Sequence, residues 1–130
     1  MFCMTWLPMA AFAPPSTSVT LCSPNTRRLS RLRDCGFHIN HIHPEGWISS
    51  CYYVGVPSVT DDVTAQQGWL KFGEPPYEPD LKAPIRSTLQ PKPGRLVLFP
   101  SYLWHGTIPF HAERTRTTIA FDVVPSAGRQ

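Results

Sequence analysis

The chain has 130 residues, enough for one domain with a single modest core, and its 15 prolines and 8 glycines exclude long helices and favour short strands joined by turns. The formal net charge of +3 comes from residues 1–35, so residues 36–130 are neutral and lack the basic surface of a nucleic-acid-binding protein. No apolar stretch approaches the ~20 residues that a membrane-spanning helix needs.

Residues 1–35 are predicted to be a tail that is disordered or loosely docked on the domain. Neither a helical nor a strand period persists there for more than a few residues. Three cysteines of this segment, Cys3, Cys22 and Cys35, show no paired metal-ligand spacing, and the fourth cysteine is Cys51. Reduced thiols in a cytoplasmic protein are a simpler interpretation than a disulfide framework.

Residues 36–126 are predicted to form the folded domain, and 127–130 a C-terminal tail. Short strands are expected, in chain order, at Phe37–His41, Trp47–Val56, Gly68–Phe72, Ile85–Leu89, Arg95–Phe99, Gly106–Phe110 and Thr115–Val124. The segments 57–67 and 73–84, rich in proline and acidic residues, are expected to be loops. Such a series of short strands without helical patterns predicts an all-β sandwich or jelly roll.

Alternation within the last predicted strand separates its two faces. Arg116, Thr118 and Asp122 share a face that is polar enough to line a cavity. Ile119 and Val123 lie on the opposite, apolar face, which needs a cover.

Three histidines suggest a metal site. His41 and His43 are separated by one residue, so both imidazoles project from the same face of an extended chain, and His105 would be the third ligand. Imidazole suits Fe, Zn, Cu or Ni, and three protein ligands leave positions open for a cosubstrate and oxygen. Structural histidines at a turn would give the same pattern, so both interpretations stay open here.

An arginine follows His105 on the adjoining strand. A guanidinium can hold a carboxylate through two parallel hydrogen bonds, as a dicarboxylate cosubstrate would require. Arg114 and Arg116 have the same parity, so alternation does not choose between them. A surface arginine on an edge strand is the alternative interpretation.

Five segments occur in a characteristic order: GFHINHIHPEGWISS at 36–50, YYV at 52–54, GWLKFG at 68–73, LVLFPSYLWHGT at 96–107 and RTTIAFD at 116–122. Together they resemble the 2-oxoglutarate- and iron(II)-dependent oxygenases of bacteria and phages. The resemblance covers residues 36–125. It implies a double-stranded β-helix, a fold of the jelly-roll and cupin type.

The resemblance also implies an oxidoreductase activity. The expected enzyme is a dioxygenase that hydroxylates a C–H bond of a small molecule or a protein side chain and forms succinate and CO2. The implied cofactors are Fe(II) and the cosubstrate 2-oxoglutarate, with ascorbate as a further reductant.

The resemblance assigns the metal ligands as follows. His41 corresponds to the first ligand of the superfamily's H-x-D/E pair, and His105 to the distal histidine. The carboxylate position falls at His43, so either the site is all-histidine or Glu45 supplies the carboxylate. We favour His43, because Pro44 constrains the backbone between the alternatives.

The resemblance likewise assigns the cosubstrate-binding residues. Arg116 matches the arginine that binds the distal carboxylate of 2-oxoglutarate, with Arg114 as the alternative. Tyr53 is placed like a tyrosine that donates to the same carboxylate, although a core tyrosine would explain it equally well.

Two rival interpretations remain. The chain could be a cupin-type jelly roll that binds a metal without 2-oxoglutarate chemistry, or an inactive fragment of a larger oxygenase. Oxygenases of this fold ordinarily have helices and strands before the first metal strand, so an N-terminal truncation is expected. An uncovered sheet would then favour self-association or require a missing N-terminal partner region.

Overall fold

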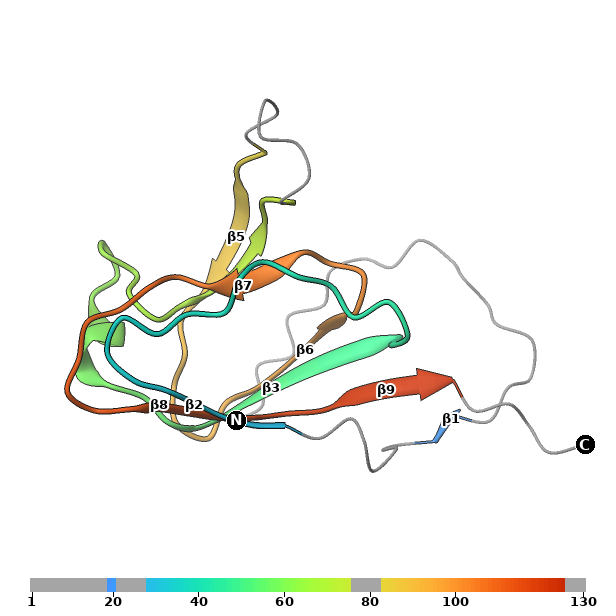
Figure 1. The fold of residues 1–130 in the computed structure, drawn as a ribbon, viewed down its shortest axis with the longest axis horizontal. Helices are drawn as coiled ribbons and strands as arrows, with labels where there is room; N and C mark the ends of the chain where they lie inside the picture. Colours follow the sequence, from blue (N-terminus) through green and yellow to red (C-terminus); the bar gives the residue numbers. More distant parts are fainter. Residues whose placement is uncertain (1–18, 21–27, 76–82, 126–130) are drawn as a thin grey trace, which may run out of the picture.

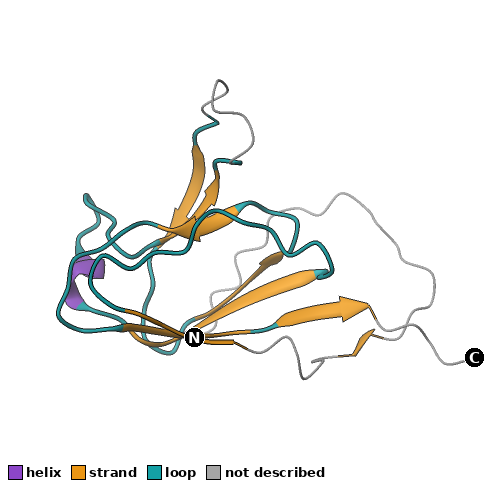
Figure 2. Cartoon of the chain, in the orientation of Figure 1, coloured by secondary structure: helices purple, strands orange, loops and turns teal. Residues whose placement is uncertain are grey.

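The computed structural model describes residues 19–20, 28–75 and 83–125. Almost all regular structure in these ranges is β-strand (Figure 2), and the helix among them is the short 3-10 helix η2 (Ser58–Asp61), inside the predicted loop 57–67. The structure therefore confirms the all-β prediction. None of the described residues forms a helix with the length and hydropathy that crossing a membrane requires.

The larger of two antiparallel sheets is centred on the long strand β3 (Ile48–Gly55). One edge of β3 pairs with β6 (Leu96–Pro100), and the other edge pairs with β8 (Arg116–Ala120) and β9 (Asp122–Pro125). The sheet is completed by β2 (Arg28–Leu32) beside β8 and by β1 (Val19–Thr20) beside β9. Two strands carrying predicted site residues, β3 and β8, are therefore direct neighbours.

The smaller sheet has the order β5 (Ile85–Leu89), β4 (Leu70–Gly73), β7 (His105–Thr107) and lies across the larger one (Figure 1). The core fills the space between the sheets: Tyr53, Val97 and Phe99 from the larger sheet are buried with Leu70 from the smaller. Burial of these side chains holds the two layers together as a sandwich of jelly-roll type.

The predicted strand Phe37–His41 is replaced by an extended segment, residues 36–43, which we call the strap. The strap runs along the free edge of β7, and His41 forms an isolated bridge with His105. The backbone N–H of Thr107 donates to the carbonyl of His38 (3.1 Å). At Gly106 a methyl group would collide with the Asn40 side chain and lie 2.9 Å from the His38 carbonyl oxygen. The strap can therefore approach β7 because residue 106 is glycine.

The end of the predicted tail belongs to the larger sheet. All five residues of β2 pair with β8, from Arg28 opposite Ala120 to Leu32 opposite Arg116. Residues 28–32 of the segment predicted to be disordered or loosely docked thus form a strand, because strand pairing uses backbone hydrogen bonds and Arg28 and Arg31 are exposed to solvent. The predictions for residues 1–18, 21–27, 76–82 and 127–130 lie outside the described residues.

The predicted strand Thr115–Val124 is divided at Phe121 into β8 and β9. At the break the Ser50 hydroxyl donates to the Phe121 carbonyl (2.7 Å) and accepts a hydrogen bond from the Phe121 N–H (2.9 Å). A buried serine thus satisfies both backbone groups of the residue that leaves the ladder.

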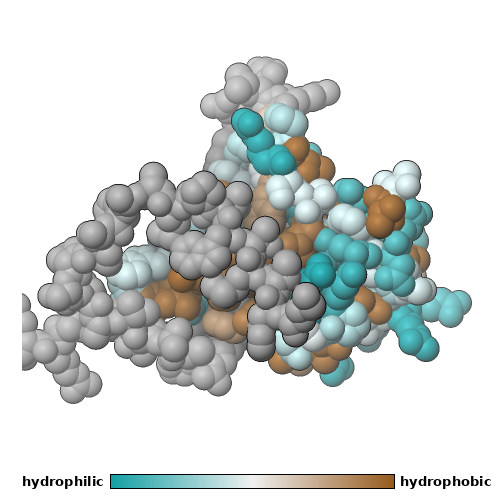
Figure 3. All heavy atoms as spheres, turned by 180° about the vertical axis from the view of Figure 1, so that it is seen from behind, coloured by the Kyte–Doolittle hydropathy of each residue, from teal (hydrophilic) through white to brown (hydrophobic). Residues whose placement is uncertain are grey.

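The outer face of the larger sheet is apolar and partly exposed. The register aligns Leu29, Ile119, Tyr52 and Leu96 in one row across β2, β8, β3 and β6, and each is at least 38% exposed. Hydrophobic side chains also reach the surface among polar ones in Figure 3. Ile119 is exposed, as expected for a sheet face without a cover, whereas Val123 is buried.

We predict that Gly106→Ala lowers the free energy of unfolding by about 1–3 kcal/mol, because the added methyl group pushes the strap away from β7. The matched control is Gly55→Ala, where a methyl group meets nothing within 4 Å. Urea unfolding of both variants measures the difference. Equal stabilities would contradict the close approach at Gly106.

Candidate metal centre

Three histidine side chains meet where the strap runs beside β7. The N–H of His41 donates to the carbonyl of His105 (3.0 Å), the N–H of His105 donates back to His41 (3.1 Å), and the N–H of His43 donates to Ser101 (2.9 Å). These bonds bring the potential ligand atoms of the three imidazoles within 4.8 Å of one another. The three rings could therefore hold one metal ion.

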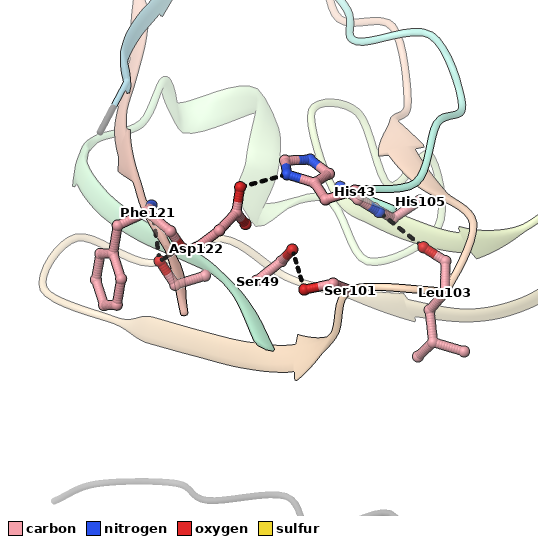
Figure 4. Close-up of polar contacts among 8 residues, drawn as sticks. His43, Ser49, Ser101, Leu103, His105, Phe121 and Asp122 are labelled. Carbon is pink, nitrogen blue, oxygen red and sulfur yellow. Dashed lines mark hydrogen bonds and ion pairs between the residues drawn. The ribbon is translucent and has the colours of Figure 1, made fainter. Parts of the chain in front are cut away.

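The hydrogen bonds of the rings determine which nitrogens are free. Nδ1 of His41 lies 2.7 Å from the Ile39 carbonyl, and Nδ1 of His105 lies 2.8 Å from the Leu103 carbonyl. A carbonyl oxygen only accepts, so both Nδ1 atoms carry the proton. Nδ1 of His43 donates to the Asp122 carboxylate (2.6 Å; Figure 4). The Nε2 lone pair of each ring is left for a metal.

His105 is the most buried of the three rings and packs against Phe99, with ring centroids 4.6 Å apart. Burial, with a smaller contribution from the nearby His41 and His43, lowers the pKa of His105 to about 4, although its bond to Leu103 opposes the shift. At neutral pH the ring is uncharged, which is the form that binds metal ions.

A second part of the site lies on the inner face of the larger sheet, where Arg116 and Tyr53 are both almost fully buried. Nε of Arg116 donates to the Gly68 carbonyl (3.0 Å), and the guanidinium carbon lies 5.1 Å from the centre of the Tyr53 ring. Nη1 of Arg116 and the Tyr53 hydroxyl have no hydrogen-bond partner. The two groups interact weakly with each other and with the thiol of Cys51, whose sulfur is a weak hydrogen-bonding partner.

The charge around Arg116 is uncompensated. Among the described residues no acidic side chain pairs with its guanidinium. Burial, together with the Cys51 thiol, raises the pKa of Tyr53 despite the nearby cation, so the phenol keeps its proton and can donate it in a hydrogen bond. A buried cation beside a buried, unused donor forms a site suited to an anion such as a carboxylate.

Two residues considered as alternatives lie elsewhere. Glu45 is exposed and does not belong to the histidine group. Arg114 is exposed and lines a surface pocket with Pro57 and Glu113. The burial of Arg116 makes it the arginine that faces the interior.

The family model described as "Putative 2OG-Fe(II) oxygenase" matches residues 29–122, more than half of the chain. The chain belongs to this oxygenase family. A search of curated proteins found no match.

This member of the family departs from the expected ligand pattern at His43, where the resemblance places a carboxylate. The structure brings a carboxylate to the same side of the site through Asp122, which accepts a hydrogen bond from His43. Sequence reasoning placed Asp122 on the cavity face without giving it a role. Its partner is 79 positions away, and no local spacing connects the two.

We predict that Asp122→Asn lowers the affinity for Fe(II) by about 10–100-fold, because the carboxylate orients His43 and increases its basicity. Anaerobic titration measures the affinity. Asp61→Asn, at an exposed position of η2, is the matched control and should leave the affinity unchanged. Unchanged affinity in Asp122→Asn would show that the contact does not support metal binding.

We also predict that the metal-free protein loses stability as the pH falls from about 6.5 to about 4. Burial, with smaller contributions from Arg116 and His41, lowers the pKa of His38 from 6.5 to about 4, so in this range the unfolded chain takes up a proton that the folded chain does not. His38 lies within hydrogen-bonding distance of the hydroxyls of Ser30 (3.0 Å) and Thr107 (3.3 Å).

Urea unfolding with a chelator, at pH 7 and pH 5, tests this dependence. His38→Gln should lose less stability than the wild type between the two pH values, because it lacks the imidazole whose pKa is lowered on folding. An equal loss in His38→Gln and the wild type would contradict the role of His38.

Proposed function

We propose that this chain is a 2-oxoglutarate- and Fe(II)-dependent dioxygenase that hydroxylates a C–H bond of a small molecule or a protein side chain. The observation that supports it most is the unpaired polar pair of Arg116 Nη1 and Tyr53 Oη, buried in the sandwich that also carries the three histidines. A group with a carboxylate at one end would satisfy both atoms.

The histidine group fits Fe(II). His41, His43 and His105 would hold the ion through Nε2, and three protein ligands leave coordination positions open for other groups. Iron(II) with 2-oxoglutarate and O2 supplies oxidative decarboxylation to succinate and CO2, coupled to hydroxylation of the substrate. The protein's own part is to bind, orient and exclude water.

Arg116 and Tyr53 would bind the far carboxylate of 2-oxoglutarate. The bond from Nε of Arg116 to Gly68 fixes one side of the guanidinium and leaves Nη1 to donate to a ligand. A buried cation without a counter-ion is costly, and an anionic cosubstrate offsets this cost on binding. The site therefore favours a dicarboxylate over a neutral ligand.

Packing and hydrogen bonds around the histidines would keep the rings rigid. Phe99 contacts the His105 ring, and Phe72 lies edge-on to Phe99 at a centroid distance of 5.1 Å. Asp122 holds the His43 ring through the hydrogen bond to Nδ1. With both rings fixed, their lone pairs need not be reoriented when a metal binds.

A second candidate is a cupin-type metal-binding jelly roll without 2-oxoglutarate chemistry. The all-histidine group favours it, because this group contains no carboxylate. The two candidates differ at Arg116. Metal binding alone does not require the buried cation, whereas 2-oxoglutarate binding does.

We predict that Tyr53→Phe weakens 2-oxoglutarate binding by about tenfold without destabilising the ligand-free protein, because the hydroxyl that it removes has no partner there. Anaerobic titration of the Fe(II) protein with 2-oxoglutarate, followed by the visible charge-transfer band, measures the affinity. Tyr52→Phe is the matched control, since Tyr52 faces outward from the same strand.

Succinate formation under air, with Fe(II), 2-oxoglutarate and ascorbate, tests the reaction itself. Turnover should fall in Arg116→Lys, which keeps the positive charge but loses the planar guanidinium that can donate two parallel hydrogen bonds to a carboxylate. A protein that binds Fe(II), shows no charge-transfer band with 2-oxoglutarate and forms no succinate would contradict the dioxygenase and support the second candidate.

A further inference from the structure

A second group of potential metal ligands lies on the surface, away from the three histidines. Asp34 and Cys35 form the turn after β2, and His111 lies in the segment between β7 and β8. The Cys35 sulfur is 3.4 Å from Nδ1 of His111 and 3.6 Å from a carboxylate oxygen of Asp34. Nδ1 of His111 is 3.4 Å from the other carboxylate oxygen.

One ligand atom from each of the three residues lies within 4.8 Å of the other two, which is close enough for all three to bind one zinc ion. Zinc lies about 2.3 Å from a thiolate and about 2.0 Å from an imidazole nitrogen or carboxylate oxygen. Tetrahedral angles then separate sulfur from nitrogen or oxygen by about 3.5 Å, and nitrogen from oxygen by about 3.3 Å. The sulfur–nitrogen distance, 3.4 Å, agrees with the tetrahedral value. The two carboxylate distances, 3.6 and 3.4 Å, belong to different oxygens of Asp34, so only one of them is an edge of the site.

Backbone and side-chain contacts hold the three groups in place without a metal. The N–H of Cys35 donates to the Phe110 carbonyl (3.0 Å), and the N–H of Ala112 donates to the Asp34 carboxylate (3.0 Å). The N–H of His111 donates to the Gln67 side chain (3.0 Å). Two segments 76 positions apart in the chain are thus fixed against each other at this point. A metal would meet a set of ligands that is already assembled.

The ligand types select among metals. A thiolate and an imidazole suit zinc, whereas magnesium and calcium prefer oxygen ligands alone. Partial desolvation at the turn, together with the negative charge of Asp34, raises the pKa of the exposed Cys35 thiol. The free thiol is therefore protonated at neutral pH and poorly reactive toward oxidants, and a metal must displace its proton.

We propose that Asp34, Cys35 and His111 form a zinc site, separate from the histidine centre, with its fourth position open to water. On binding, the Cys35 S–H bond gives its proton to solvent and a zinc–sulfur bond replaces it. The ion links the end of β2 to the segment that leads into β8, and so to the strand of Arg116. Its role is to fix this corner of the sandwich.

Cobalt(II) is the probe that separates this site from the histidine centre. A thiolate bound to cobalt gives a near-ultraviolet charge-transfer absorption, and the three histidines offer no sulfur. The full-length, reduced protein titrated with Co²⁺ should show this band, and Zn²⁺ should remove it. Cys35→Ser should abolish the band, and His111→Ala should weaken Co²⁺ binding at this site by at least about tenfold.

The other cysteines provide the controls. Cys51→Ser and the double variant Cys3→Ser/Cys22→Ser should keep the band, and circular dichroism verifies that every variant is folded. A wild-type protein without the band at Co²⁺ concentrations that saturate the histidine centre would overturn the proposal. A band of unchanged intensity in folded Cys35→Ser would overturn it as well.

Discussion

The reciprocal backbone hydrogen bonds between His41 and His105 are the constraint on which the rest of the site depends. They join the strap to the edge of β7 and place two potential metal ligands directly opposite each other. The contact requires a residue without a side chain at position 106, because the strap passes so close to β7. The smaller sheet thus supplies one ligand itself and positions the others through the strap.

The electrostatics of the interior follow from a small number of groups. The buried imidazole of His105 is neutral at neutral pH, and Arg116 adds a buried positive charge that no described acidic side chain pairs with. Asp122 is the nearby carboxylate, and it is already engaged by His43. The surroundings of Arg116 therefore attract an anion rather than a neutral ligand.

Much of the fold could be predicted from turn-forming residues and alternation. The strand Ile85–Leu89 was predicted with the observed bounds, and β3, β4 and β6 to within about two residues at each end. β2 was not predicted, because its arginines interrupt the alternation of apolar and polar residues that marks a strand. Its pairing with β8 depends on backbone hydrogen bonds, which leave no pattern in the sequence. The break at Phe121 was also missed, since it depends on the hydroxyl of Ser50.

The candidate site, too, could be predicted from the sequence only in part. The convergence of His41, His43 and His105 could be anticipated, because two of them share a strand face and the resemblance supplied the third. Alternation alone could not choose between Arg114 and Arg116, because only the packed structure shows which one is buried. The contacts from His43 to Asp122 and from Cys35 to His111 each join distant parts of the chain, so no local pattern reveals them.

The distance along the chain between these partners has a consequence for how the protein folds. β2 pairs with β8, and His43 with Asp122, across most of the domain, so the chain must close large loops before either contact forms. Proteins dominated by such distant pairings fold slowly. The arrangement of the three histidines thus depends on contacts between distant parts of the chain, which can form only after large loops have closed.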